Sequence, residues 1–187
     1  MESIEEALLD SEDKMAKSAA FIQEQFSGIR TGKASPALVE NIEVPYYGTP
    51  TRLREMASIS TPEPRLIVIN AYDPSVLGEI EKAILAANLG VTPMNDGRVV
   101  RVPIPELSEE RRTEMTKLAK RMAEEGRVAI RNIRRETNDQ VKALQKNGKA
   151  TEDERDEALK DIQKSTDEYI KQIDDALKAK ETEIMEV

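Results

Sequence analysis

The placement of proline constrains the fold of this chain more than any other feature of the sequence. All nine prolines lie between residues 36 and 105, whereas residues 1–35 and 106–187 contain none. Proline breaks helices and is common in turns, so the two flanks can form long helices and the middle cannot. We therefore predict a discontinuous helical domain, interrupted by an inserted domain of another kind.

Both flanks have apolar residues at the three- and four-residue steps of a single helical face. A side chain suited to capping precedes each of three helices: Ser3 with Glu6, Ser108, and Thr151 with Glu154. The second helix is expected from about residue 108 to 146, ended by Asn147-Gly148. At ~1.5 Å per residue it would be about 60 Å long, which exceeds the width of a compact domain. The flanks thus predict an elongated antiparallel three-helix bundle.

The middle stretch has strand and turn signals instead. Three segments rich in β-branched residues predict strands: "ENIEV" (40–44), "LREMASIST" (53–61) and "RLIVINAY" (65–72). Residues 75–90 form an amphipathic pattern that predicts a helix, and residues 91–103 predict a hairpin with Asn95-Asp96-Gly97 at its turn. This segment is expected to be a small β/α/β domain.

The chain is therefore assigned to the α+β class with two domains. Residues 1–31 and 105–187 are predicted to form the bundle, and residues 32–104 the inserted domain. Two short connections near 30–32 and 102–105 join them. Gly32 gives the first connection free backbone dihedrals, and Pro103 and Pro105 keep the second from becoming helical. Two short connections of this kind make a plausible hinge.

Composition excludes several kinds of function. The chain has no His and no Cys, which rules out serine–histidine and cysteine–histidine catalysis, disulfides and thiolate metal sites. The N-terminal residues lack the features of a signal peptide, and no apolar run approaches the ~20 residues of a membrane span. We expect a soluble, cytoplasmic protein that is not an enzyme and holds no metal.

Positive charge is concentrated in one part of an acidic chain. The formal net charge is -8, yet residues 106–147 carry 11 basic and 8 acidic groups. On a helical wheel with Ile133 at zero, four arginines of this segment fall between about 100° and 200°, away from the predicted core. We call the following residues of this sector the basic face: Lys117, Lys120, Arg127, Arg131, Arg134, Arg135, Asn138 and Lys142. Only Glu124 interrupts it.

Charged residues on the outside of a helix are usually just solvated, and this alternative stays open. Two observations favour a ligand. Arginine, whose planar fork suits phosphate, outnumbers lysine within the cluster. The cluster also lies in a chain that is acidic elsewhere, so solubility alone does not call for it. Like charges four residues apart cost an isolated helix a few tenths of a kcal/mol, and a bound polyanion would offset that cost. The sequence lacks an aromatic cluster for stacking bases, so the favoured ligand is structured RNA bound through its backbone.

Two other functions are possible. The chain could be a coiled-coil adaptor whose acidic third helix binds a basic protein. It could also be an enzyme with its active site in the inserted domain, but the carboxylates there show no convergent spacing. They include Glu40, Glu43, Asp73 and Asp96.

Five motifs, in order along the chain, resemble the bacterial ribosome recycling factor family. They are "IRTGKASPAL" (29–38), "VPYYGTPTRL" (44–53), "EKAILAANLGVTP" (81–93), "RVPIPELSEERR" (101–112) and "RVAIRNIRRE" (127–136). The resemblance covers essentially the whole chain. It implies a three-helix bundle and an α+β domain, joined by a flexible hinge into an L that resembles transfer RNA.

The resemblance also implies a function. Such a factor binds the 70S ribosome after termination and, with elongation factor G and GTP, splits the subunits and releases messenger and deacylated transfer RNA. It implies a monomer that contacts large-subunit ribosomal RNA but neither DNA nor a membrane, and that needs no cofactor, because GTP is used by elongation factor G.

The family motifs place residue roles on this sequence. Arg131 and Arg134 are the first expected ribosomal RNA contacts, with Arg127 and Arg135 next. The expected hinge residues are Arg30, Thr31, Gly32, Val102, Pro103, Ile104 and Pro105. One residue departs from the pattern: Gly126 stands in mid-helix where alanine is expected, at a cost of about 1 kcal/mol.

Overall fold

A computed structural model describes residues 3–186 and contains two compact units. One unit combines the chain up to Ile29 with the chain from Arg112 onward, and the other comprises Arg30–Arg111. The first is helical and the second is a small α+β unit, which confirms the predicted class and the insertion. The predicted boundaries, 31/32 and 104/105, lie two and seven residues away from these.

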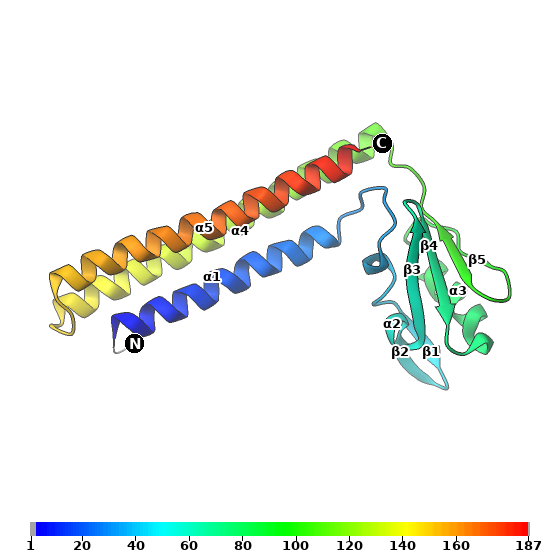
Figure 1. Ribbon diagram of the computed structural model, residues 1–187, viewed down its shortest axis with the longest axis horizontal. Helices are drawn as coiled ribbons and strands as arrows, with labels where there is room; N and C mark the ends of the chain where they lie inside the picture. Colours follow the sequence, from blue (N-terminus) through cyan, green and yellow to red (C-terminus); the bar gives the residue numbers. More distant parts are fainter. Residues whose placement is uncertain (1–2, 187) are drawn as a thin grey trace. The chain divides into compact units, whose positions relative to one another are not determined.

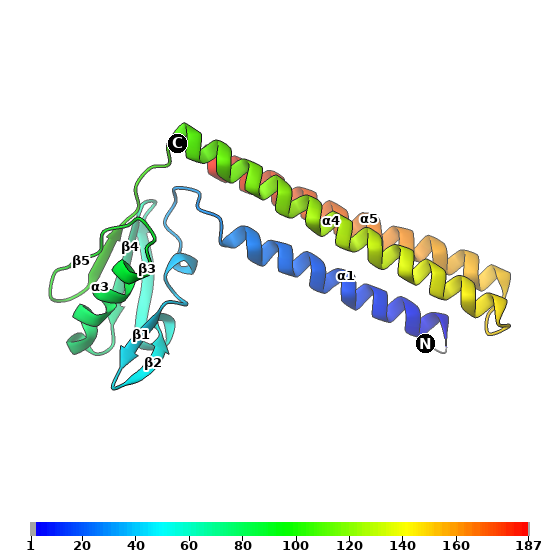
Figure 2. The ribbon, with the colours of Figure 1, turned by 180° about the vertical axis from the view of Figure 1, so that it is seen from behind.

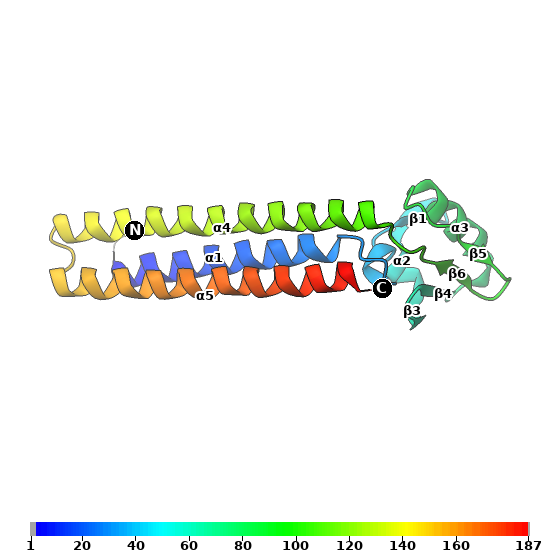
Figure 3. The ribbon, with the colours of Figure 1, turned by 90° about the horizontal axis from the view of Figure 1, so that it is seen from above.

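The helical unit consists of α1 (Ile4–Ser27), α4 (Glu109–Lys146) and α5 (Glu152–Met185). The helices lie side by side, with α1 and α5 running in one direction and α4 in the other (Figure 1). Views from behind and from above show the same arrangement (Figures 2 and 3). The predicted antiparallel three-helix bundle is confirmed.

The predicted capping residues act at all three helix starts. The Ser3 and Ser108 hydroxyls accept hydrogen bonds from the backbone N–H groups of Glu6 and Arg111, each at 3.2 Å. Thr151 and Glu154 form a complete capping box, in which each side chain accepts from the other residue's backbone N–H. These bonds satisfy backbone donors that a helix start leaves without partners.

The bundle core on α4 is not centred on Ile133, as the sequence pattern predicted, although Val141 and Leu144 of the predicted apolar stripe are buried. The fully buried residues of α4 are mostly small: Ala119, Ala123, Gly126, Ile130, Thr137, Val141 and Leu144. The larger residues Met115, Leu118, Met122 and Ile133 are only half-buried and flank this line. The core centre is therefore about 50° from Ile133 on the helical wheel, toward the arginines. The sequence pattern gave weight to large apolar residues, whereas the helices approach most closely at small ones.

Gly126 marks this close approach. A Cβ atom at residue 126 would lie 2.6 Å from Ile22 Cγ1 of α1 and 3.0 Å from Ile173 Cδ1 of α5. Contacts this short are repulsive, so alanine does not fit without movement of both neighbours. Glycine at this position is explained by close packing, because the contacts among three helices outweigh the helix propensity of one residue.

The inserted unit contains a two-stranded and a four-stranded antiparallel sheet. The first pairs β1 (Glu43–Tyr46) with β2 (Thr49–Arg52). The second has the order β3-β4-β6-β5, formed by β3 (Ala57–Glu63), β4 (Leu66–Ala71), β5 (Met94–Asn95) and β6 (Val100–Pro103). Helix α3 (Leu77–Ala86) buries Leu77, Ile80 and Ile84 in the same cluster as the inward residues of β4 and β6.

Short helical turns complete this unit, at η1 (Pro36–Leu38), α2 (Leu53–Met56) and η2 (Pro74–Val76). The predicted strand "LREMASIST" is thus wrong in its first four residues, which form α2. The prediction also missed β2, whose sequence "TPTR" contains a proline that weakens the strand pattern. The predicted hairpin is confirmed: β5 and β6 pair antiparallel and are joined by residues 96–99, so that Asn95 ends β5 and Asp96-Gly97 lie in the turn.

Two of the predicted hinge residues lie inside the sheet. Val102 and Pro103 belong to β6 and stand opposite Ile67 and Leu66 of β4, and Val102 is fully buried. The predicted connection therefore begins too early. Pro103 and Pro105 predict an irregular segment, but β6 extends through Pro103 and pairs with β4. The residues outside helices and strands are Ile104–Ser108 on this side and Gly28–Ser35 on the other, where Gly32 has φ +78°. None of the helices formed by residues 3–186 has both the length and the apolar character that a membrane span requires.

Candidate ribosomal RNA interface

The basic face of α4 divides into residues that contact neighbouring side chains and residues that point to solvent. Because the core centre is rotated toward the arginines, Arg127 and Arg134 flank the core instead of lying opposite to it. Both are partly buried and reach toward α5. The prediction that all the arginines lie on the outer surface is therefore wrong for these two.

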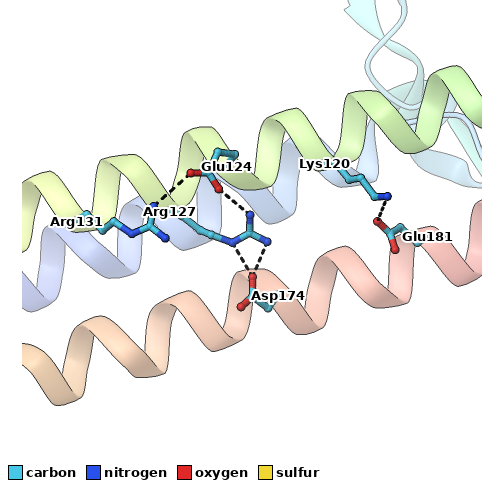
Figure 4. A network of polar contacts seen from close by, with 6 residues as sticks. All are labelled: Lys120, Glu124, Arg127, Arg131, Asp174 and Glu181. Atoms are coloured by element: carbon cyan, nitrogen blue, oxygen red, sulfur yellow. Dashed lines mark hydrogen bonds and ion pairs between the residues drawn. The ribbon is translucent and has the colours of Figure 1, made fainter.

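Arg127 is held by two carboxylates. Its Nε and Nη2 both bond Asp174 Oδ1 of α5 at 2.7 Å, and its Nη1 bonds Glu124 Oε2 of α4 at 2.9 Å (Figure 4). Only 20% of its side chain is exposed. Burial opposes the charged form of Arg127, but the bonds to Asp174 and Glu124 outweigh it and raise the pKa of the guanidinium. Arg127 thus links two helices of the bundle.

Glu124 joins two arginines. Its Oε2 accepts from Arg127, and its Oε1 accepts from Arg131 Nη1 at 3.2 Å. The hydrogen bond from Arg127 is the main cause that holds the pKa of the Glu124 carboxyl below its usual range. Burial acts in the opposite direction, and the bond from Arg131 lowers the pKa further. Glu124 is therefore not an interruption of the basic face, as the sequence suggested, but a bridge within it.

A groove of about 410 Å³ runs between α4 and α5 at this network. Its charged lining is balanced, with three cations and three carboxylates: Arg127, Arg131, Lys178, Glu124, Asp174 and Glu181. Lys120 approaches Glu181 at 3.9 Å across the same pair of helices. The groove itself is therefore not a strongly positive surface.

Further along α4 the basic residues have fewer partners. Arg134 Nη1 donates to Gln163 Oε1 of α5 at the long distance of 3.4 Å. Asn138 is half-buried, and among residues 3–186 its buried Oδ1 has no hydrogen-bond partner. Lys117, Arg135 and Lys142 are exposed, and no ion pair or hydrogen bond of their side chains occurs within the described chain. These three cations, with the outer edges of Arg131 and Arg134, form the accessible positive surface.

Sequence reasoning missed the α5 residues that contact the basic face, namely Gln163, Asp174 and Glu181. A signal for two of them was present, because Gln163 and Asp174 directly follow the core residues Ile162 and Ile173. Residues that flank a helical core stripe face the neighbouring helix. A wheel drawn for α4 alone contains no information about the charges of α5.

Two of the carboxylates of the inserted unit, Asp73 and Asp96, have local structural roles. Asp73 accepts from the backbone N–H and the hydroxyl of Ser75, at 3.0 Å and 2.7 Å, at the start of η2. Asp96 accepts from the backbone N–H groups of Arg98 and Val99, both at 2.9 Å, and these bonds lower its pKa to about 2. Within residues 3–186 no cluster of three or more acidic side chains is arranged to hold a metal ion.

Comparison with known proteins identifies the family. The family model "Ribosome recycling factor" matches residues 22–185. The chain belongs to the ribosome recycling factor family. The ribosome-recycling factor of Pelotomaculum thermopropionicum is 50% identical over 97% of this chain and 98% of that protein. That of Carboxydothermus hydrogenoformans is 48% identical over 98% of this chain and all of that protein.

Solved structures of the family agree with the fold. A solution structure of a ribosome recycling factor is 40% identical, covers 98% of each chain and superimposes with a TM-score of 0.81. A second structure presents the T. thermophilus ribosome recycling factor and E. coli elongation factor G bound to the E. coli post-termination complex. That factor is 41% identical to this chain, with a TM-score of 0.70 over 98% of this chain and all of the other. The bundle and the inserted unit are thus the two domains of this family.

Proposed function

We propose that this ribosome recycling factor binds the post-termination 70S ribosome and, with elongation factor G and GTP, splits it into subunits. The observation that carries the proposal is family membership along almost the whole chain, together with a relative solved on a post-termination complex with elongation factor G. Messenger and deacylated transfer RNA leave in the same step. The chain itself acts without catalysis, as a binding and force-transmitting factor.

We assign ribosomal RNA binding to the accessible part of the basic face. Lys117, Arg135 and Lys142 have no carboxylate partner within residues 3–186 that a phosphate must displace. Arg134 has only a weak neutral partner, Gln163. Each cation that neutralises a phosphate releases counterions, so the affinity for the ribosome falls with salt in proportion to the number of such contacts.

Binding to 70S ribosomes over a salt series tests this assignment. Lys142→Ala and Arg134→Ala are each expected to weaken binding by about tenfold. In each variant the slope of log affinity against log salt concentration is expected to become shallower by the equivalent of about one phosphate contact. Lys164→Ala on α5 is the matched control for Lys142→Ala, because it removes the same charge from an exposed site outside the basic face. If the basic-face variants and the control behave alike, the assignment is wrong. Binding that survives digestion of ribosomal RNA would favour the adaptor alternative.

We also propose that the two connections, Arg30–Gly32 and Ile104–Pro105, serve as a hinge. Gly32 has φ +78°, which proline cannot adopt, so Gly32→Pro forces a different path on the first connection. We expect this variant to bind 70S ribosomes normally and to split them more slowly, as measured by light scattering in the presence of elongation factor G and GTP. An unchanged splitting rate would remove Gly32 from the hinge.

A further inference from the structure

The network of Figure 4 forms a chain of contacts across two helices. Asp174 of α5 accepts from Arg127, Arg127 also donates to Glu124, and Glu124 accepts from Arg131. Each carboxylate oxygen of Glu124 serves a different arginine. The orientation of Arg131 is therefore connected to α5 through two intermediate side chains.

The two arginines differ in what they can still bind. Three nitrogens of Arg127 already donate to carboxylates, and its side chain is 20% exposed. Arg131 is 41% exposed, and its one side-chain hydrogen bond within residues 3–186 uses Nη1 alone. A phosphate can therefore reach the free edge of the Arg131 guanidinium, whereas at Arg127 it would have to displace two carboxylates.

We propose that Arg127 is a positioning residue, which acts through Glu124 to orient Arg131 toward an RNA phosphate. Asp174 fixes Arg127, Arg127 fixes one oxygen of Glu124, and the other oxygen holds Nη1 of Arg131 so that its remaining donors face outward. A flexible arginine loses side-chain entropy when it binds. If the guanidinium of Arg131 is already ordered in the free protein, part of that entropic cost does not have to be met on binding. This inference rests on the proposed function, because it assumes that the basic face binds ribosomal RNA.

A double-mutant cycle on Arg127 and Arg131 tests the proposal, with purified large ribosomal subunits as the probe and affinity measured over a salt series. Arg131→Ala is expected to weaken binding about tenfold and to make the salt slope shallower by about one contact. Arg127→Ala is expected to weaken binding about threefold to fivefold with an unchanged salt slope. In the Arg131→Ala background, Arg127→Ala is expected to change affinity by less than about 1.5-fold, because its target is gone.

Two further variants separate positioning from charge. Arg127→Lys keeps the charge but cannot bond two carboxylates with a planar fork, so it is expected to behave like Arg127→Ala. Asp174→Asn is expected to weaken binding in the same direction. Tighter binding by Asp174→Asn would overturn the proposal, because it would mean that the carboxylates compete with phosphate instead of orienting arginine.

Arg155→Ala is the matched structural control. Arg155 of α5 also reaches across to α4, where it donates to Gln145 Oε1 at 3.2 Å, and it donates to Asp156 of its own helix at 2.9 Å. Within residues 3–186 it has no hydrogen bond or ion pair with the basic face. We expect it to lower the stability of the bundle without changing affinity. If Arg127→Ala weakens binding equally with and without Arg131, or makes the salt slope shallower, Arg127 is a contact or a general support and the proposal is wrong. If the wild type itself binds without salt dependence, the proposed function fails instead.

Discussion

The bundle and the inserted domain reach their folds by different means. In the bundle, the decisive contacts join residues far apart in the chain: Gly126 of α4 lies between Ile22 of α1 and Ile173 of α5. In the inserted domain, many contacts are local, as when Asp96 accepts from backbone N–H groups two and three residues away. The bundle therefore depends on side-chain volume at a few positions, and the inserted domain on the chemistry of its turns.

Replacement of glycine by alanine is expected to change stability in opposite directions in the two domains, and this is the largest contrast we expect. Gly126→Ala adds a Cβ atom 2.6 Å from Ile22 Cγ1, and overpacking of this kind costs about 1–3 kcal/mol. The better helix propensity of alanine offsets up to about 1 kcal/mol of this cost. We expect a net loss of about 1–2 kcal/mol in the stability of the bundle, measured by amide hydrogen exchange in α4.

Gly78→Ala is the control for that experiment. Gly78 is exposed in the first turn of α3, and a Cβ atom there would have no neighbour within 4 Å. We expect a gain of a few tenths of a kcal/mol in the inserted domain from helix propensity alone. If both substitutions stabilised their domains, the close approach at Gly126 would not limit the packing of the bundle.

The same contrast explains how much the sequence could predict. Helix caps, the Asn95-Asp96-Gly97 turn and the extent of the long helices depend on neighbouring residues, and these predictions were correct. The role of Gly126 and the partners of Arg127 depend on which helices meet, and a pattern within one helix does not contain that information. The short α2 and β2 were missed because four-residue elements carry too little periodicity to be recognised.

The basic face shows the limit most clearly. Its residues were found by counting charge and helical phase, but their division into linked and accessible groups could not be predicted. Arg127 and Arg135 have the same side chain and lie two turns apart. Arg127 contacts two carboxylates, whereas Arg135 is exposed and its side chain has no hydrogen bond or ion pair within residues 3–186. The difference comes from Glu124 of α4 and Asp174 of α5. The sequence predicted that α5 is acidic, but not which of its residues contacts Arg127.

Lowering the pH is expected to affect a turn of the inserted domain through Asp96. The pKa of this carboxyl is about 2 in the folded protein, below the ordinary value of 3.8, because the N–H groups of Val99 and Arg98 bond its charged form. A depressed pKa means that ionised Asp96 stabilises the fold above about pH 4, and that this contribution is lost as the pH falls toward about 2. The carboxyl-carbon chemical shift of Asp96, followed by NMR, should therefore titrate with a midpoint near pH 2.

Asp96→Asn supplies the control for the titration. The amide keeps one acceptor oxygen but no charge, so the inserted domain of this variant is expected to be less stable at pH 7 and to lose less stability on acidification to pH 2. A midpoint near the ordinary value of 3.8 for the wild-type carboxyl would show that the turn does not depend on the ionised side chain.

A small effect is also expected in the β1–β2 hairpin, where turn chemistry is not at its optimum. Tyr47 and Gly48 form its two-residue loop with φ +48° and +78°, a combination that favours Asn-Gly. A tyrosine in this left-handed conformation costs about 1 kcal/mol, and its edge-on contact with the Tyr46 ring, at 4.6 Å between centroids, returns part of that cost. Tyr47→Asn is therefore expected to stabilise the inserted domain by only about 0.5 kcal/mol and to leave hydrogen exchange in the bundle unchanged. A loss of stability would mean that the ring contact outweighs the backbone strain, and that even in the inserted domain packing, not turn chemistry, determines the preferred residue.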